Sequence, residues 1–92
     1  MLCRHKDITF IEGQNEYLKI HLKSGDPFLT HMTFDKILDM LPDNFIRIHR
    51  SYVVNMLFAV SVERKSVNLP DGTRLPVSDT RRASLFQYMN VE

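Results

Sequence analysis

The sequence has little of what marks several common classes of protein. Its 92 residues include one cysteine, Cys3, no tryptophan, and only 3 glycines and 4 prolines. A single cysteine forms no internal disulfide and supplies too few thiolates for a structural zinc site, so a reducing, cytoplasmic location is expected. No run of about 18 apolar residues occurs, and residues 1–10 lack the apolar stretch of a secretory signal. We therefore expect neither a membrane span nor export.

An excess of one charge is also missing, because 12 Lys and Arg face 11 Asp and Glu for a net charge of +1. Nucleic-acid-binding modules are often strongly basic, so this balance argues at first against DNA or RNA as a partner. The charge is unevenly distributed, however. Residues 1–43 hold 5 basic and 7 acidic side chains, whereas residues 44–92 hold 7 and 4. Any surface that meets a polyanion is therefore expected to come mainly from the second half.

Alternating apolar and polar residues predict a mostly β fold in one continuous domain spanning residues 1–92. In residues 17–23, Leu18, Ile20 and Leu22 point to one side, as in a half-buried strand, and residues 24–27 form a turn into the next strand. Asp71 and Gly72 mark a second tight hairpin. The expected strands are residues 8–12, 17–23, 28–31, 45–49, 52–54, 58–62, 67–69 and 75–77.

Two segments have helical periodicity. Residues 33–41 place apolar side chains at i, i+3, i+4 and i+7, with Thr33 as N-cap and Pro42 as the stop. A second helix is expected over residues 80–89, capped by Ser78 or Asp79, with Leu85, Phe86 and Met89 as its buried stripe. Its first turn carries two arginines, which the helix dipole disfavours there; a bound phosphate would compensate.

Enzymatic chemistry is not expected. No serine, threonine or cysteine has a spacing that implies activation by a base, and no glycine-rich loop for phosphate is present. The four histidines lack ligand spacing, so no metal and no cofactor are expected. His21 and His31 are expected to face each other across the hairpin on a solvent face. Tyr17 is expected to be the only clearly solvent-exposed aromatic residue of the chain.

The most informative segment is residues 45–55, FIRIHRSYVVN. Its alternation predicts an apolar edge of isoleucines, with Arg47 and His49 projecting from the other edge. Arg50 and Ser51 then fall at the break between two strands. A guanidinium offers five donors suited to phosphate or guanine, and a hydroxyl can bond phosphate oxygens. A basic surface strand with no nucleic-acid partner remains the alternative on this pattern alone.

With residues 8–22 (ITFIEGQNEYLKIHL), 33–42 (TFDKILDMLP) and 69–82 (LPDGTRLPVSDTRR), this segment resembles the LytTR family of bacterial DNA-binding domains. The four blocks occur in the family's order from about Ile8 to Met89. The resemblance implies small antiparallel sheets with one inserted helix and a short C-terminal helix. It also implies binding of duplex DNA through loops, in a domain excised from a longer regulator and lacking a first strand.

The resemblance places three loops against DNA. Gln14, Asn15 and Glu16 form the first, with Lys19 near a phosphate. Arg50 is the best candidate for contact with a base edge, with His49 and Asn15 as weaker ones. The remaining expected contacts, mostly to phosphate, are Ser51, Ser78, Asp79, Thr80, Arg81 and Arg82. Asp79 departs from the family's basic residue and is interpreted as a helix cap, with contact to a cytosine amino group as the alternative. Tyr52 and Asn55 match the motif but are expected to have structural roles.

By the same resemblance, the domain acts as the output domain of a two-component transcriptional response regulator. An N-terminal receiver domain would precede it, and it would bind repeated DNA sites as a dimer without membrane contact. The alternative function is a β-rich protein-interaction module that pairs a partner with the exposed strand edge of residues 28–31.

Overall fold

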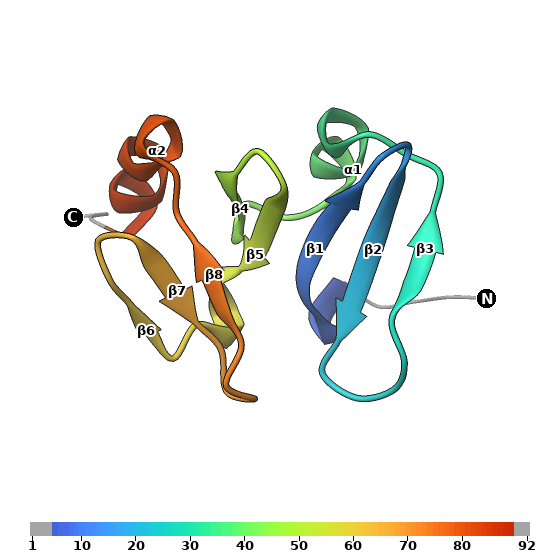
Figure 1. The fold of residues 1–92 in the computed structure, drawn as a ribbon, viewed down its shortest axis with the longest axis horizontal. Helices are drawn as coiled ribbons and strands as arrows, with labels where there is room; N and C mark the ends of the chain where they lie inside the picture. Colours follow the sequence, from blue (N-terminus) through green and yellow to red (C-terminus); the bar gives the residue numbers. More distant parts are fainter. Residues whose placement is uncertain (1–4, 90–92) are drawn as a thin grey trace.

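The computed structural model describes residues 5–89; Cys3 lies outside them. Within this range the fold is mostly β, with two antiparallel sheets and two α-helices (Figure 1). The larger sheet has the order β3-β2-β1-β5-β4 and the smaller one β6-β7-β8. The elements in chain order are η1 (His5–Asp7), β1 (Ile8–Gln14), β2 (Tyr17–Leu22), β3 (Phe28–Thr30), α1 (Phe34–Met40), β4 (Phe45–His49), β5 (Tyr52–Asn55), η2 (Met56–Phe58), β6 (Ser61–Val62), β7 (Ser66–Asn68), β8 (Arg74–Pro76) and α2 (Asp79–Met89).

Strands β1, β5 and β4 of the larger sheet are buried on both faces, because their side chains alternate between two hydrophobic cores. Ile11 of β1 pairs with Val53 of β5, and both join Phe34 and other residues of α1 in the first core. Their neighbours Phe10 and Val54 point the other way, into a second core shared with the small sheet and α2. The large sheet is thus the central layer between α1 on one side and the small sheet with α2 on the other (Figure 1).

The predicted hairpin and inserted helix are confirmed. Strand β2 pairs with β3 in the register Leu18 to Thr30, and α1 begins after Thr33, whose hydroxyl accepts from the N–H of Lys36 at 3.2 Å. Glycine at two turns adopts positive φ, +94° at Gly25 and +92° at Gly72, as the turn residues predicted. Short-range signals of alternation, capping and turn chemistry were therefore sufficient for these elements.

Two strand predictions were wrong in extent. Strand β1 continues through Gln14, which pairs with Tyr17, so only Asn15 and Glu16 remain in the turn. Residues 58–62 do not form a strand throughout: Met56–Phe58 is a short 3-10 helix, and only Ser61–Val62 is β6. The cause is Asn55, whose side-chain oxygen accepts from the N–H of Leu57 at 3.0 Å and turns the chain.

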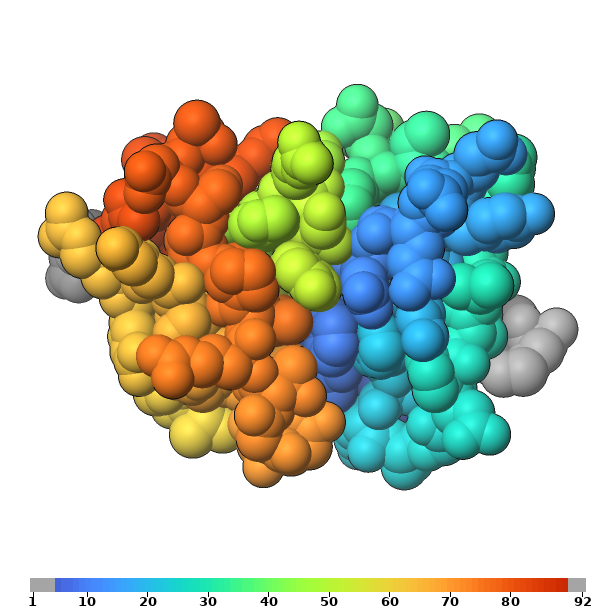
Figure 2. All heavy atoms as spheres, in the orientation of Figure 1, coloured from blue at the N-terminus to red at the C-terminus, as the bar shows by residue number. Residues whose placement is uncertain are grey.

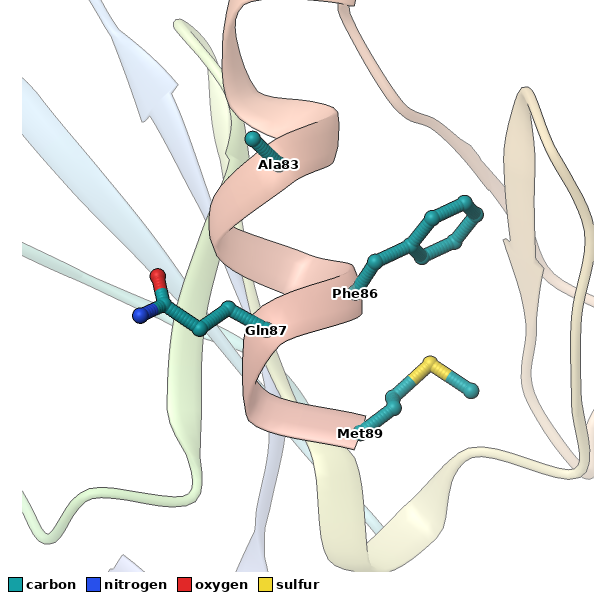
Figure 3. Close-up of a pocket in the computed structure, with 4 residues that line it drawn as sticks. All are labelled: Ala83, Phe86, Gln87 and Met89. Carbon is teal, nitrogen blue, oxygen red and sulfur yellow. The ribbon is translucent and has the colours of Figure 1, made fainter. Parts of the chain in front are cut away.

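The second helix also differs from its prediction. It begins at Asp79, so Ser78, one of the two predicted caps, directly precedes the helix, whereas Asp79 lies in its first turn. Leu85 is fully buried, but Phe86 and Met89 are 39% and 48% exposed. Figure 3 shows these two side chains on the same side of α2, directed away from the helix. Periodicity identified an apolar stripe, but of its three side chains only Leu85 is buried in the second core.

The histidine prediction was wrong as well. His21 stacks on Phe10, with ring centroids 4.0 Å apart, and its Nε2 lies 3.2 Å from a Glu12 carboxylate oxygen. His31 instead lies beside Glu16 and against the edge of Tyr17. Tyr17 is not the only exposed aromatic residue, since Phe28 is 37% exposed and Phe86 is exposed too.

Candidate nucleic-acid interface

Three turns that the sequence singled out lie along one edge of the molecule. The first turn is Asn15 and Glu16, the second turn is Arg50 and Ser51, and the third turn is residues 78–82. Figure 1 shows the β1–β2 hairpin end, the β4–β5 hairpin end and the start of α2 all at the top, with α1 seen between the two hairpin ends. In Figure 2 the β4–β5 hairpin projects between the other two. We call these three segments the turn edge.

Backbone hydrogen bonds hold the turn edge together. The N–H of Gly13 donates to the carbonyl of Ser51 at 2.9 Å, which joins the first turn to the second. The N–H of Ser78 donates to the carbonyl of Ile48 at 2.8 Å, which joins the third turn to β4. A Cβ at position 13 would lie 3.0 Å from the Phe34 ring, so glycine permits the close approach. The three turns are therefore fixed relative to one another by the fold.

The first turn is shaped by a residue in the left-handed region. Asn15 has φ +56°, a conformation that asparagine adopts more readily than most residues, and its side chain is exposed. The carboxylate of Glu16 lies 3.4 Å from Nε2 of His31. Lys19 lies farther along β2, opposite Glu12 and Leu29, and is half-buried. Of the first group, only Asn15 and Glu16 thus belong to the turn edge.

The second turn presents Arg50 outward while its backbone is held from two sides. Nη2 of Arg47 donates to the carbonyl of Arg50 at 2.8 Å, and the N–H of Ser51 donates to Nδ1 of His49 at 3.1 Å. Because Nδ1 accepts here, the ring proton of neutral His49 sits on Nε2. Arg50 is exposed, and no ion pair within residues 5–89 engages it. Its guanidinium is therefore free for a ligand.

Arg47 is a site residue that the sequence did not identify as one. The expectation that Arg47 and His49 share an edge was wrong because the β4–β5 register shifts between them. The shift is a bulge, which changes the face to which following side chains point. Arg47 lies over the Phe34 ring with 4.6 Å from Cζ to the centroid, whereas His49 packs against Tyr52. In the sequence, the only indication of this role is that Arg47 lies between two isoleucines of an expected strand.

Partial burial and a neighbouring arginine both act on the charge of Arg47. Burial is the main cause that lowers its pKa, and the nearby charge of Arg81 lowers it further, while Asp35 acts in the opposite direction. Its Nε is buried and has no hydrogen-bond partner within the described residues. Arg47 also lines a surface depression with Asn15, Arg50 and Ser51. Two arginines outnumber the one acidic side chain, Glu16, that lines this depression, which favours an anion there.

Two adjacent arginines of the third turn, Arg81 and Arg82, have different surroundings. Arg82 is only 18% exposed, and its Nε donates to the carbonyl of Arg64 at 2.8 Å while Nη2 binds Asp79 at 2.7 Å. The bond from Arg82 lowers the pKa of the Asp79 carboxyl. Arg81 has no ion pair among the described residues. Ser78 and Thr80 lie next to it, with their hydroxyl oxygens 3.3 Å apart.

A shallow depression on α2 offers far fewer polar groups than the turn edge. It is lined by Ala83, Phe86, Gln87 and Met89, and Gln87 supplies its only polar side chain (Figure 3). Within residues 5–89 no three His, Cys, Asp or Glu side chains gather closely enough to hold a metal ion. No helix in this range has both the length and the apolar character needed to cross a bilayer.

Tyr52 and Asn55 have structural positions in this structure. The buried Asn55 accepts from Asn44 Nδ2 at 2.6 Å and donates to the carbonyl of Ile8 at 2.8 Å, linking β5 to the start of β1. The Tyr52 ring lies against the second core, 6.2 Å from that of Phe10. Neither is part of the exposed turn edge.

Comparisons with known proteins identify the family of this chain. The family model of the LytTr DNA-binding domain matches residues 1–90. Two curated relatives from Paraburkholderia xenovorans (strain LB400), the heme-containing CO-sensing transcriptional regulators RcoM 1 and RcoM 2, are each 31% identical over 93 residues. The match covers 94% of this chain and 34% of each relative, so the chain spans about a third of their length.

A solved structure shares the fold. It is the LytTr DNA-binding domain of a protein from Bacillus cereus described as a methyl-accepting/DNA response regulator, with a TM-score of 0.88. The similarity covers 99% of this chain and 88% of that one at 18% identity. On the family match over residues 1–90, this chain belongs to the LytTr family of DNA-binding domains, whose function is DNA binding in transcription regulation.

Proposed function

We propose that the turn edge binds duplex DNA sequence-specifically, with the turns entering major grooves and flanking groups binding phosphates. The observation that carries the proposal is the second turn. It presents an exposed Arg50 at the tip of a hairpin whose backbone is held by Arg47 and by His49. A guanidinium so presented matches the O6 and N7 acceptors of guanine, and fixing its backbone reduces the entropy lost on binding.

The other groups divide between base and phosphate contacts. Asn15 and His49 are the secondary candidates for base edges. Arg81 and the hydroxyls of Ser51, Ser78 and Thr80 are suited to phosphate, because positive charge and hydroxyl donors both favour anionic oxygens. Arg82 is mainly a positioning residue, since its guanidinium is already bound to Asp79 and Arg64. Lys19 reaches phosphate only if the duplex extends along β2.

Two acidic residues on the turn edge limit where phosphates can lie. Glu16 and Asp79 are both exposed, and each is paired with a basic group, His31 or Arg82. A phosphate close to either carboxylate would be repelled. The acidic groups therefore restrict the positions in which a duplex can lie on the turn edge. The carboxylate of Asp79 can also accept a hydrogen bond from a cytosine amino group.

In the whole protein, we propose, this chain is the output domain of a cytoplasmic regulator that binds repeated half-sites as a dimer. The neighbour described as a response regulator supports control by a receiver domain, whereas the two relatives are described as sensing CO through heme. The longest dimension of the domain, 37 Å, is close to one turn of B-DNA. Half-sites of a dimer are then expected about 10 base pairs apart, or multiples of this.

The proposal is tested by selecting bound duplexes from a random pool and measuring the salt dependence of binding to the selected site. We expect an enriched half-site containing guanine, and a slope of log K against log salt near −3.6 for about four neutralised phosphates. Recovery of unenriched sequences, together with binding that does not weaken as salt rises, would contradict it.

The protein-interaction alternative has one observation in its favour. Strand β3 is an outer strand of the large sheet, and its Leu29 is 55% exposed. Pairing through this edge would be insensitive to substitution of Arg50 and only weakly dependent on salt. The variant Leu29→Lys separates the two functions, because it charges the β3 edge and leaves the turn edge unchanged.

A further inference from the structure

The β6–β7 turn carries two basic side chains that the three-turn interface does not include. Arg64 and Lys65 lie between β6 and β7, and both are exposed. The turn is closed by the N–H of Glu63, which donates to the carbonyl of Ser66 at 2.7 Å. Its backbone is therefore ordered by a hydrogen bond of its own.

The β6–β7 turn is also attached directly to the third turn. The N–H of Val77 donates to the carbonyl of Lys65 at 2.9 Å, and Nε of Arg82 donates to the carbonyl of Arg64 at 2.8 Å. Both bonds use backbone oxygens of the β6–β7 turn, so the side chains of Arg64 and Lys65 remain unused. Their charges lie close enough to Asp79 to help lower the pKa of its carboxyl, after the larger effect of Arg82.

No ion pair within the described residues neutralises Arg64 or Lys65. The adjacent acid, Glu63, is directed elsewhere: its carboxylate accepts from Arg74 Nη2 at 2.9 Å and from Asn68 and Ser66. The β6–β7 turn therefore presents two positive charges at the end of the molecule next to α2, where Figure 2 shows it projecting at the left. It lies at one end of the long axis of the molecule, beside α2 (Figure 2).

We propose that Arg64 and Lys65 bind backbone phosphates of duplex DNA outside the segment contacted by the turn edge, and so lengthen the bound site on one side. This inference rests on the proposed function. The contacts are sequence-independent, because a guanidinium and an ammonium at an exposed turn meet phosphate oxygens without reaching base edges. Their anchoring to the third turn fixes their distance from Arg81, so the added contacts fall at a defined distance from the half-site.

The test compares two duplexes and two double variants. The core duplex contains only the selected site, and the long duplex adds about one helical turn, 10 base pairs, on each side. The variant Arg64→Gln/Lys65→Gln removes the proposed contacts while keeping the backbone oxygens that anchor the third turn. The control variant Lys6→Gln/Lys23→Gln removes the same charge from η1 and the β2–β3 loop, at the end of β1 and β2 that lies away from the turn edge. Binding is followed by fluorescence anisotropy between about 50 and 200 mM salt.

On the long duplex, wild type and control should show a salt slope steeper than the Arg64→Gln/Lys65→Gln variant by about 1.8, two phosphates at about 0.9 each. Across the fourfold salt range this is an additional loss of affinity of about 12-fold. On the core duplex the slopes should agree, and base preference should be unchanged throughout. Hydroxyl-radical footprints of wild type should extend past the half-site on one side, and those of the variant should not.

Equal slopes for wild type and variant on the long duplex would overturn the inference, as would an equal loss on both duplexes. Either result leaves the proposed function standing if Arg50→Ala still reduces binding to the selected site. Failure of the wild type to bind either duplex would overturn the proposed function, and with it this inference.

Discussion

Arg50 and Arg47 are three positions apart, and the structure gives them different tasks. Arg50 is exposed at the second turn, whereas Arg47 stacks on Phe34 and donates to the Arg50 carbonyl. A side chain that reads a base must reach away from the protein, so another group has to fix the backbone from which it extends. The bulge in β4 achieves this by turning Arg47 towards α1 and His49 towards Tyr52.

Arg50→Ala is expected to flatten base preference because it removes the proposed guanine contact. Affinity for the selected duplex should fall about 5- to 150-fold, equivalent to about 1–3 kcal/mol, while affinity for random duplexes should change little. Fluorescence anisotropy on both duplexes measures the difference. Lys23→Ala is the matched control, because Lys23 lies in the β2–β3 loop at the opposite edge of the molecule (Figure 1). An equal loss on both duplexes would show that Arg50 contacts phosphate only.

Arg47→Ala should destabilise the fold and reduce selectivity together. Loss of the bond to the Arg50 carbonyl and of the contact with Phe34 should cost about 1–2 kcal/mol of unfolding free energy, measured by urea denaturation. Arg47→Lys keeps the charge but lacks the planar fork. If Arg47 positions the second turn, Lys should not restore base preference; full restoration would instead assign Arg47 a purely electrostatic role.

At the scale of elements, some boundaries of helices and strands depend on contacts between residues that are distant in sequence, and the sequence pattern alone did not predict these boundaries. Thr33 and the residues of the β2–β3 hairpin act through neighbours in sequence, so their roles were predictable. Asn55 caps η2 through the N–H of Leu57, but its side chain is held in place by Asn44 and the Ile8 carbonyl, which are distant in sequence, so alternation alone missed η2. Likewise, periodicity placed Phe86 on an apolar stripe of α2 without showing whether another element covers it.

The interface had the same limit. Resemblance of motifs indicated which turns gather on one edge. It did not indicate that Arg82 is bound to the Arg64 carbonyl or that Arg47 faces Phe34, because both contacts join separate elements. The resemblance therefore identified the three turns. The tertiary structure was needed to separate the arginines available to DNA from those that position the backbone.

Asn55→Ala should reduce the unfolding free energy by about 2–4 kcal/mol. The change leaves the N–H of Leu57 and the carbonyl of Ile8 without their partner, and unsatisfied buried polar groups are costly. Thermal or urea unfolding followed by circular dichroism measures it. Asn68→Ala is the control, since its amide bonds are exposed, and should cost under about 1 kcal/mol. Similar losses in both variants would contradict the assignment of Asn55 as the buried link.

Asp79→Asn should strengthen DNA binding about two- to fivefold, because it removes a negative charge from the turn edge and releases Arg82. The gain in affinity should shrink as salt rises.

The folded pKa of Asp79 lies below its ordinary value of 3.8, so its ionised form stabilises the fold. That small, salt-screened contribution is present above pH 3.8 and is lost as pH falls through the lowered pKa. The unfolding free energy of Asp79→Asn should therefore lack this decrease at low pH, which urea denaturation at a series of pH values measures. Weaker binding by Asp79→Asn would instead support contact with cytosine.

At the scale of the whole molecule, the near-neutral net charge reflects a division between two halves of the chain. The basic residues of the second half gather near the turn edge and the β6–β7 turn, while the first half contributes more acidic side chains. Such a protein should bind non-specific DNA weakly, since that affinity depends on the number of phosphates neutralised. Discrimination is then left to a few side chains on turns that two hydrophobic cores hold in place.

The central claim, that the turn edge is the DNA-binding surface, is tested most directly by NMR. Amide chemical shifts of the labelled domain are followed while the selected duplex is added. The largest changes are expected at Asn15 and Glu16, at Arg50 and Ser51, and over residues 78–82, with little change in β3 or the β2–β3 loop. Changes centred on β3, or on the exposed Phe86 and Met89 of α2, would contradict the claim.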